Sequence, residues 1–266
     1  MVSQADLQGR VLLNVAHGVA HVRLNRPDKM NAFDDVQFKA LAGRIDEIAG
    51  RRDIRCVVIS GEGRAFSVGI DLAALAESSD LRDLMPRTHG DANLFQQCGW
   101  GLRTLPVPVI AAVHGFAFGA GFQVMLGADI RVAAPDMECA MMEIRWGIAP
   151  DMGGIALLRG LVRSDVAREI VFTGKRMKAA EAAALGLVSH VADDPLALAM
   201  EMARSIASSS PDAIRAAKRL LDLPWETDAA TILMAESREQ TALMASDNHR
   251  EALTAGMEKR PPVYRD

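Results

Sequence analysis

The stretch VIAAVHGFAFGAGFQ, residues 109–123, joins an apolar strand to a run of glycines. Its first five residues are apolar and the strand stops just before a glycine, as the buried strands of parallel sheets do. Residues 56–60, CVVIS, have the same character and stop at GEG, residues 61–63. We therefore predict two buried parallel strands, each of which delivers the chain to a glycine loop.

The two glycine loops are GRAFSVGIDL, residues 63–72, and HGFAFGAGFQ, residues 114–123. Backbone N–H groups near a helix start are unsatisfied and carry partial positive charge, so they can bind an anion or a developing oxyanion. Glycine lets a ligand approach such a backbone closely. One loop alone is ordinary turn chemistry, but two in order indicate a site for an oxyanion.

Other site chemistries fit the sequence poorly. The chain has no GxxxxGK[ST] phosphate loop, no dinucleotide fingerprint with its acidic residue, and no GxSxG nucleophile elbow. His17 and His21 are four residues apart but lie across a predicted turn, so they are not expected to bind a metal. These observations disfavour nucleotide binding, triad hydrolysis and a metal site.

Composition bounds the class of protein. Half of the 266 residues are apolar, enough for a substantial core. The formal net charge of −4, with Lys and Arg dispersed, gives no basic stripe for a nucleic acid. No stretch approaches the roughly 20 apolar residues of a membrane span, and the start lacks signal-peptide character. We expect a cytoplasmic protein with no nucleic-acid or membrane partner, and Cys56, Cys98 and Cys139 as reduced core residues.

The remaining patterns predict an α/β fold. Residues 11–16 and 19–24 alternate around His17-Gly18 and predict a β-hairpin. Asn31 is placed to cap an amphipathic helix that ends at Gly50. From residue 151 onward helical patterns dominate, and one short apolar run interrupts them. We expect residues 1–200 to form one αβ unit and residues 201–266 a helical region that packs on the core or on a neighbouring subunit. A strand is also expected at 129–132, and the last helices at 211–221, 229–244 and 249–259.

Two carboxylates stand in AMMEIRWGIAPDMGG, residues 140–154. Glu143 ends an apolar run, and a partly desolvated carboxylate there would have a raised pKa suited to proton transfer near neutral pH. An ion pair with Arg145 or Arg131 is the alternative for Glu143. Asp151 precedes a predicted helix, where its ordinary role is to cap the helix.

Several ordered segments resemble the crotonase superfamily, the enoyl-CoA hydratase/isomerase family. The glycine loops resemble its two oxyanion-hole motifs, and MEIRWGIAPDMGG, residues 142–154, resembles its acid/base segment. Its opening, strand and C-terminal signatures are matched by LNRPDKMNA at 24–32, PVPVIAA at 106–112 and MEKR at 257–260. The resemblance covers nearly the whole chain. It implies a crotonase-like spiral of ββα turns with a helical C-terminal region, assembled as a homotrimer or homohexamer.

The resemblance also assigns roles residue by residue. The amides of Ile70 and Ala120 would hold the thioester oxygen of an acyl-CoA, whose CoA is part of the substrate, so no separate cofactor is expected. Glu143 matches a hydratase glutamate that serves as the base in isomerases, and Asp151 resembles an aspartate of dienoyl-CoA isomerases. Gln123 stands where hydratases carry their other glutamate, and an amide cannot exchange protons at neutral pH. The residues implied in substrate binding are Lys29, Met30, Ala65, Phe66, Val68, Asp71, Phe116, Gly119, Gln123, Trp146 and Lys259; core packing is the alternative for Met30, Phe66, Phe116 and Trp146, and a solvated surface for the lysines.

The favoured reaction is isomerisation of an enoyl-CoA, from 3-enoyl to 2-enoyl or of the dienoyl type. Isomerisation can return one proton through one carboxylate, whereas hydration needs two groups. One alternative is a hydratase in which Asp151, or Gln123 with a positioned water, replaces the lost carboxylate. Another is a CoA-binding scaffold protein without catalysis. Residues 76–90 have weak periodicity and indicate a mobile cover over the site or a variable surface loop.

Overall fold

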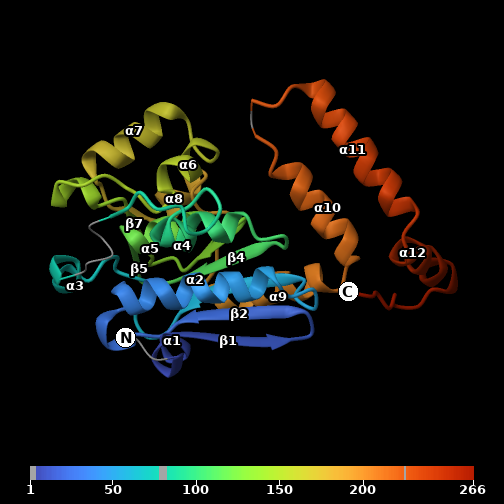
Figure 1. Ribbon diagram of the computed structural model, residues 1–266, viewed down its shortest axis with the longest axis horizontal. Helices are drawn as coiled ribbons and strands as arrows, with labels where there is room; N and C mark the ends of the chain where they lie inside the picture. The colour runs from blue at the N-terminus through green and yellow to red at the C-terminus, as the bar shows by residue number, and fades with distance from the viewer. Residues whose placement is uncertain (1–3, 78–82, 225) are drawn as a thin grey trace.

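The computed structural model of the chain describes residues 4–77, 83–224 and 226–266. The described strands form a six-stranded sheet in the order β1-β2-β3-β4-β6-β9 and a three-stranded sheet in the order β5-β7-β8 (Figure 1). The six strands of the larger sheet are β1 (Val11–Ala16), β2 (Val19–Leu24), β3 (Cys56–Gly61), β4 (Val109–Val113), β6 (Ile130–Ala133) and β9 (His190–Val191). The smaller sheet contains β5 (Phe116–Phe118), β7 (Glu138–Ala140) and β8 (Met177–Lys178).

The predicted hairpin and buried strands are present. Strands β1 and β2 pair antiparallel, with Val11 opposite Leu24. His17 and Gly18 join them with φ angles of 51° and 76°, and two positive φ values are typical of the hairpin turn that matches strand twist. From β2 onward, neighbours in the large sheet are parallel. The run around residue 189 forms only the short strand β9, and β8 was not predicted because two residues carry no periodic signal.

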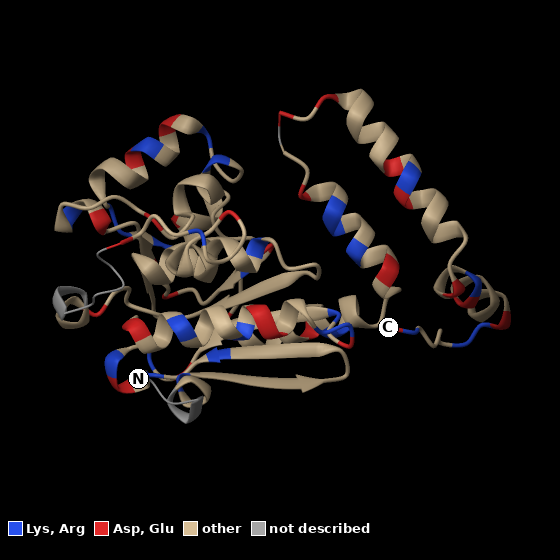
Figure 2. Cartoon of the chain, in the orientation of Figure 1, with Lys and Arg blue, Asp and Glu red and all other residues tan. Residues whose placement is uncertain are grey.

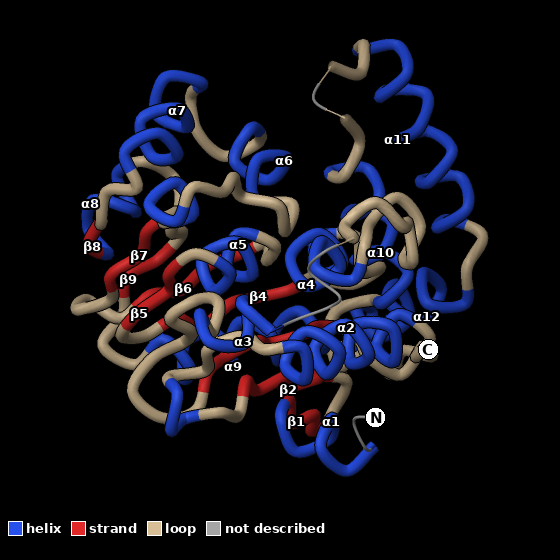
Figure 3. Tube along the Cα trace, turned by 60° about the vertical axis from the view of Figure 1, so that its left-hand side comes forward, coloured by secondary structure: helices blue, strands red, loops and turns tan. Residues whose placement is uncertain are grey.

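Helices cover both faces of the large sheet because its side chains alternate between them. Val57 and Ile59 of β3 pack with α2 (Asp35–Ala49), α4 (Leu94–Arg103) and α5 (Ala120–Leu126). Val58, between them, packs with Ile110 against α9 (Pro195–Ala207). Figure 3 shows the strands as a layer between these helices. Both glycine loops leave this layer at the carboxyl ends of parallel strands.

The start of α2 differs from the prediction. The residue that caps α2 is Asp34, whose Oδ1 accepts the N–H of Gln37 at 2.9 Å. Asn31 is completely buried, has a φ of 56°, and donates through Nδ2 to the carbonyls of Glu62 and Ala65 at 2.9 and 2.8 Å. Asn31 therefore ties the opening turn to the first glycine loop. A local pattern could not distinguish this role from a cap, since the partners lie more than 30 residues away.

The last three helices stand apart from the sheet (Figure 1). Helix α10 (Pro211–Leu221) begins after Ser210, whose Oγ accepts the N–H of Ala213, and α11 (Ala229–Met244) has the predicted bounds. Helix α12 (Asp247–Glu258) begins two residues before its prediction. The expected boundary between residues 200 and 201 falls inside α9, which packs on the sheet through Ala199, Ala203 and Ala207. The remaining described helices are α1 (Gln4–Arg10), α3 (Leu72–Glu77), α6 (Gly154–Arg159), α7 (Ser164–Thr173) and α8 (Ala179–Ala184), with short 3-10 helices η1 (Pro27–Lys29) and η3 (Glu143–Trp146).

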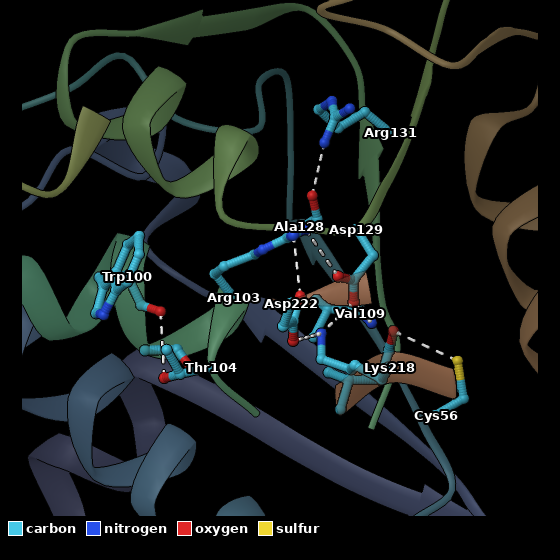
Figure 4. Close-up of polar contacts among 12 residues, drawn as sticks. Cys56, Trp100, Arg103, Thr104, Val109, Ala128, Asp129, Arg131, Lys218 and Asp222 are labelled. Atoms are coloured by element: carbon cyan, nitrogen blue, oxygen red, sulfur yellow. Dashed lines mark hydrogen bonds and ion pairs between the residues drawn. The ribbon is translucent and has the colours of Figure 1, made fainter. Parts of the chain in front are cut away.

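A network of charges joins α10 to the sheet (Figure 4). The ammonium group of Lys218 lies 2.5 Å from Oδ2 of Asp129, and only 6% of its side chain is exposed. Asp129 also accepts the N–H of Val109 at 2.8 Å, at the start of β4. Arg103 of α4 bridges Asp129 and Asp222 at 3.3 and 2.9 Å. The network therefore fixes α10 to the large sheet and to α4.

Surface charge and the cysteines agree with the composition. Figure 2 shows Lys and Arg interspersed with Asp and Glu along the helices. Cys56, Cys98 and Cys139 are buried and free, and burial raises the pKa of Cys56 and Cys139 to about 12. Thiols that are this hard to ionise are poor nucleophiles. Among the described helices, none is long and apolar enough to cross a membrane.

Candidate active site

The backbone pairing of the first glycine loop leaves the Ile70 amide without a partner. Phe33 and Ile70 form an isolated parallel bridge: the N–H of Phe33 donates to the carbonyl of Gly69 at 2.7 Å, and the N–H of Asp71 donates to the carbonyl of Phe33 at 2.8 Å. A parallel bridge uses the groups that flank the opposite residue. The N–H of Ile70 therefore points to the other edge, and it has no acceptor within the described chain.

The second loop presents the Ala120 amide in the same way. The N–H of Gly119 donates to the carbonyl of Ala140 at 2.9 Å, which extends the pairing of β5 with β7. Gly119 then turns with φ 49° and ψ −116°, a backbone conformation that glycine adopts far more easily than other residues. Ala120 is the first residue of α5, where an N–H has no intrahelical acceptor. No acceptor for it occurs elsewhere among the described residues.

The two loops approach each other because residue 69 is a glycine. A Cβ atom placed on Gly69, which has a φ of 100°, would lie 2.8 Å from the carbonyl oxygen of Phe118 and 3.6 Å from the amide nitrogen of Ala120. Any side chain there would push the loops apart. Because the loops are close, the free amides of Ile70 and Ala120 face the same space, as an oxyanion hole requires.

Both amides open onto a cavity of about 270 Å³. Its walls are mainly apolar, and Glu143 is the only ionisable residue among the described residues that line it. The lining consists of Val68, Gly69, Ile70, Leu72, Phe118, Gly119, Ala120, Met142, Glu143, Trp146 and Ile148. A mostly apolar cavity with a few convergent polar groups is typical of small-molecule sites.

A larger depression of about 540 Å³ lies between α6 and α7. Its polar lining consists of Arg159, Ser164 and Arg168, and the other described residues that line it are apolar. None of the described residues that line it carries a carboxylate. The smaller cavity is therefore the better candidate for chemistry.

Glu143 starts η3 with its side chain turned inward. Only 6% of Glu143 is exposed, Oε1 accepts the Nε2–H of Gln123 at 2.7 Å, and Oε2 is buried without a hydrogen-bond partner among the described residues. Burial raises the pKa of Glu143; hydrogen bonds from the backbone and Gln123 oppose this rise, and the charge of Asp151 adds to it. A carboxylate with a raised pKa and one free oxygen can accept and return a proton.

The alternative roles of Glu143 and Asp151, an ion pair and a helix cap, were wrong. Arg145 donates to the carbonyl of Gly174 at 2.9 Å, and Arg131 donates to backbone carbonyls near β6, so neither pairs with Glu143. Asp151 does not cap α6 either. The residue at that position is Gly153, with a φ of 85° and no side-chain hydrogen bond. Burial raises the pKa of Asp151, which is half-buried and is not among the described residues that line the cavity.

Gln123 lies behind Glu143 and not in the cavity wall. It is 1% exposed, and its Oε1 accepts the N–H groups of Met152 and Gly154 at 2.9 and 3.1 Å. A Cβ atom on Gly154 would lie 2.6 Å from this oxygen, so glycine is needed for the contact. The expectation that Gln123 contacts substrate is corrected: its polar atoms are used within the protein. Its Oε1 already accepts two bonds, and its Nε2 already donates to Glu143.

The other expected residues differ in where they lie. Val68, Gly119 and Trp146 line the cavity with Ile70, Ala120 and Glu143. Ala65 and Phe66 are completely buried in the core, so the expectation that they contact substrate is corrected. Asp71 pairs with Arg26 at 3.0 Å. Phe116 stacks beside Phe118, with ring centroids 5.1 Å apart, and it is Phe118 that lines the cavity. The lining residues that were not predicted are Gly69, Leu72, Phe118, Met142 and Ile148. The period of two along 116–118 could have indicated Phe118.

The expected CoA-side residues lie outside the cavity. Lys29 is exposed in η1, and the carbonyl of the half-buried Met30 accepts the N–H of Val68 at 3.1 Å. Lys259 is exposed and follows α12 directly; Figure 1 shows α12 at the opposite end of the molecule from α3 and β5. Of the predicted cover at 76–90, residues 78–82 lie outside the described part. The described part includes a bridge between His89 and Ala92.

The comparison with protein families is decisive. The family described as "Enoyl-CoA hydratase/isomerase" matches residues 14–266. The chain belongs to the enoyl-CoA hydratase/isomerase family. The resemblance stated from the glycine loops is therefore confirmed, and with it the prediction of an enzyme of this family.

Individual relatives agree with this membership. The short-chain-enoyl-CoA hydratase of Clostridium acetobutylicum is 31% identical over 94% of this chain and 95% of its own. The mitochondrial Delta(3,5)-Delta(2,4)-dienoyl-CoA isomerase of Homo sapiens is 36% identical over 75% of this chain and 64% of its own. The crystal structure of an enoyl-CoA hydratase from Bacillus anthracis matches with a TM-score of 0.87 and 29% identity, covering 96% of this chain and 98% of the other. The crotonase-like α/β fold is confirmed, and hydratase names are more frequent than isomerase names among these similar proteins.

Proposed function

We propose that this enzyme isomerises an enoyl-CoA by moving the double bond from position 3 to position 2, with Glu143 as the proton shuttle. The observation that carries the proposal is the single free carboxylate oxygen in a cavity that also receives two unpartnered amides. One carboxylate suffices for this reaction because the proton that leaves one carbon returns to another. CoA enters as part of the substrate, and no separate cofactor is invoked.

The proposed steps balance without another reactant. The Glu143 carboxylate takes a proton from C2 of a 3-enoyl-CoA, and the electron pair moves into a dienolate whose oxygen accepts the N–H groups of Ile70 and Ala120. The protonated Glu143 then gives the same proton to C4, and the double bond forms between C2 and C3. Each missing oxyanion-hole donor in such a site costs about 10²- to 10³-fold in kcat. The amides therefore carry much of the rate.

Hydration of a 2-enoyl-CoA is the second candidate, supported by the names of many relatives. The hydratase would need a second group to activate water, and Gln123 is an amide whose polar atoms are already bonded. Asp151 is the remaining carboxylate whose charge acts on Glu143. A dienoyl version of the isomerisation would use Glu143 and Asp151 together, as the name of the human relative suggests.

The test is conversion of a 3-enoyl-CoA in deuterated water by the wild type and by Glu143→Gln. We expect a conjugated 2-enoyl-CoA from the wild type and a loss of at least about 10³-fold in the variant, as for removal of an essential general base. Water addition to crotonyl-CoA without isomerisation would replace this proposal by the hydratase. Binding of acyl-CoA without either reaction would favour the scaffold alternative.

We also propose that the enzyme forms a homotrimer or homohexamer through its C-terminal helices. Helix α11 has no buried residue in the described single chain, and Leu233 and Met234 are 61% and 54% exposed. Large apolar side chains that are this exposed favour a protein partner over water. Light scattering of the wild type and of Leu233→Asp/Met234→Asp measures the assembly; a monomeric wild type would contradict the proposal.

A further inference from the structure

The orientation of the Gln123 side chain is determined by its neighbours. One end of the amide receives two backbone N–H groups, from Met152 and Gly154, and only the carbonyl oxygen can accept them. The NH₂ end must therefore face Glu143, 2.7 Å from Oε1. Gln123 is almost completely buried, so water does not compete for these bonds.

This arrangement makes the two oxygens of Glu143 unequal. Oε1 always has a donor, whereas Oε2 is buried without a partner among the described residues. A hydrogen-bond donor lowers the proton affinity of the oxygen that it contacts. We propose that Gln123 is a positioning residue that selects Oε2 of Glu143 as the oxygen that takes and returns the substrate proton. The proposal rests on the proposed function only in that Glu143 is the shuttle.

The donor is compatible with both stages of a proton shuttle. When Glu143 is ionised, the N–H of Gln123 donates to Oε1 of the carboxylate. When Oε2 carries the proton, Oε1 becomes the carbonyl oxygen of the acid and still accepts the same N–H. An ionised glutamate at position 123 would instead meet Oε1 as a like charge, and it could bond only by sharing a proton. Glutamine therefore holds the acid without competing for its proton.

Gln123 also connects the shuttle to the turn before α6. Its oxygen bonds the amides of Met152 and Gly154, and residue 151 precedes this pair directly. Asp151 is the charged group that acts on Glu143 in the described structure, alongside backbone groups and Gln123 itself. A purely structural role would need only the oxygen of Gln123. The proposed role needs its NH₂ group.

The variant Gln123→Glu separates these two roles because it keeps an oxygen for Met152 and Gly154 and loses the donor to Glu143. We expect kcat for the 3-enoyl-CoA to fall about 10- to 100-fold, with KM nearly unchanged since residue 123 does not line the cavity. The acid limb of the pH profile should move to higher pH. Gln97→Glu is the matched control: it removes an Nε2 donor to the carboxylate of Asp46, 2.9 Å away, at the surface.

A measurement without turnover keeps this inference separate from the proposed reaction. In the wild type, the side-chain N–H resonances of Gln123 should titrate with the carboxyl ¹³C resonance of Glu143, which is assigned by its loss in Glu143→Gln. This holds even if the wild type does not isomerise, and it does not depend on the folding of any position-123 variant. Gln123 resonances that do not respond to the Glu143 titration, or a folded Gln123→Glu enzyme with an unchanged pH profile, would overturn the proposal.

Discussion

Arg26 lies 3.0 Å from Asp71, the residue that follows the oxyanion donor Ile70. The same guanidinium donates to the carbonyl of Ala32 at 3.0 Å, next to Phe33, which forms the bridge with Ile70. Arg26 therefore holds both segments of the bridge that points the Ile70 amide into the cavity. The side chain is 14% exposed, which limits screening of these contacts by water.

Replacing Arg26 by Met should lower kcat about 10-fold, because a loosened donor loses part of the roughly 10²-fold contribution of an oxyanion-hole amide. Steady-state kinetics with a 3-enoyl-CoA measure the effect. Arg219→Met, which breaks a surface pair with Glu239 between α10 and α11, should leave kcat unchanged. Equal kinetics of Arg26→Met and the wild type would show that the bridge keeps its geometry without the ion pair.

The pH profile of kcat/KM should report Glu143. The rate needs the ionised carboxylate, so it falls as pH drops through the pKa of Glu143, which burial and the charge of Asp151 hold above its ordinary value. Asp151→Asn removes that negative charge and should move the acid limb to lower pH. The exposed substitution Asp165→Asn serves as the control. An unchanged acid limb in Asp151→Asn would show that the charge of Asp151 does not affect the pKa of Glu143. Full activity of this variant on a dienoyl-CoA would exclude Asp151 as a second proton carrier.

Glu143 should also make the fold less stable at neutral pH. The pKa of Glu143 is raised in the folded state, so the native protein binds this proton more tightly than the unfolded chain does. The free energy of unfolding of the wild type therefore increases as pH falls from the folded pKa toward the unfolded pKa of about 4.3. Glu143→Gln should therefore gain on the order of 1 kcal/mol at neutral pH, and this difference should shrink in acid. Urea unfolding of both proteins at several pH values measures it. A pH-independent difference would contradict the linkage.

The charge network under α10 should matter more to stability than surface pairs. Lys218→Met leaves Asp129 with only Arg103 and the amide of Val109, so we expect a loss of about 3 kcal/mol in the free energy of unfolding. Lys175→Met breaks an exposed pair with Glu169 and should cost less than about 1 kcal/mol. Hydrogen exchange adds a local readout: amides of α10 should exchange faster in Lys218→Met. Equal losses in the two variants would contradict the burial argument.

The sequence predicted the parts of the fold that depend on local patterns. The hairpin, the buried strands β3 and β4 and the bounds of α11 follow from periodicity and turn residues within each segment. The glycine loops indicated the oxyanion hole because backbone amides need no particular side chain. The patterns predict Asn31 as a cap and leave Asp151 open between a cap and a catalytic role, because each precedes a helical pattern. Long-range contacts decide the role of Asn31.

The positions of individual side chains in the site were harder to predict, because long-range contacts decide them too. Phe66 was expected near the ligand and lies in the core, whereas Phe118 faces the cavity. Both are apolar residues beside a glycine loop, so their sequence surroundings do not distinguish them. The role of Gln123 depends on two amides about 30 residues away and on the absence of a side chain at Gly154. Only the packed structure brings these groups together.

The contacts of Gln123 also bear on how this chain could change over generations. Glutamine and glutamate codons differ by a single base, so a carboxylate at position 123 lies one point mutation away. The amides of Met152 and Gly154, which now donate to the Gln123 oxygen, would donate to a carboxylate oxygen equally well. The backbone contacts would thus survive the exchange, and its effect would fall on the charge and proton chemistry that residue 123 shares with Glu143. A gene encoding this enzyme therefore stands a single base away from one whose site holds two carboxylates in place of one.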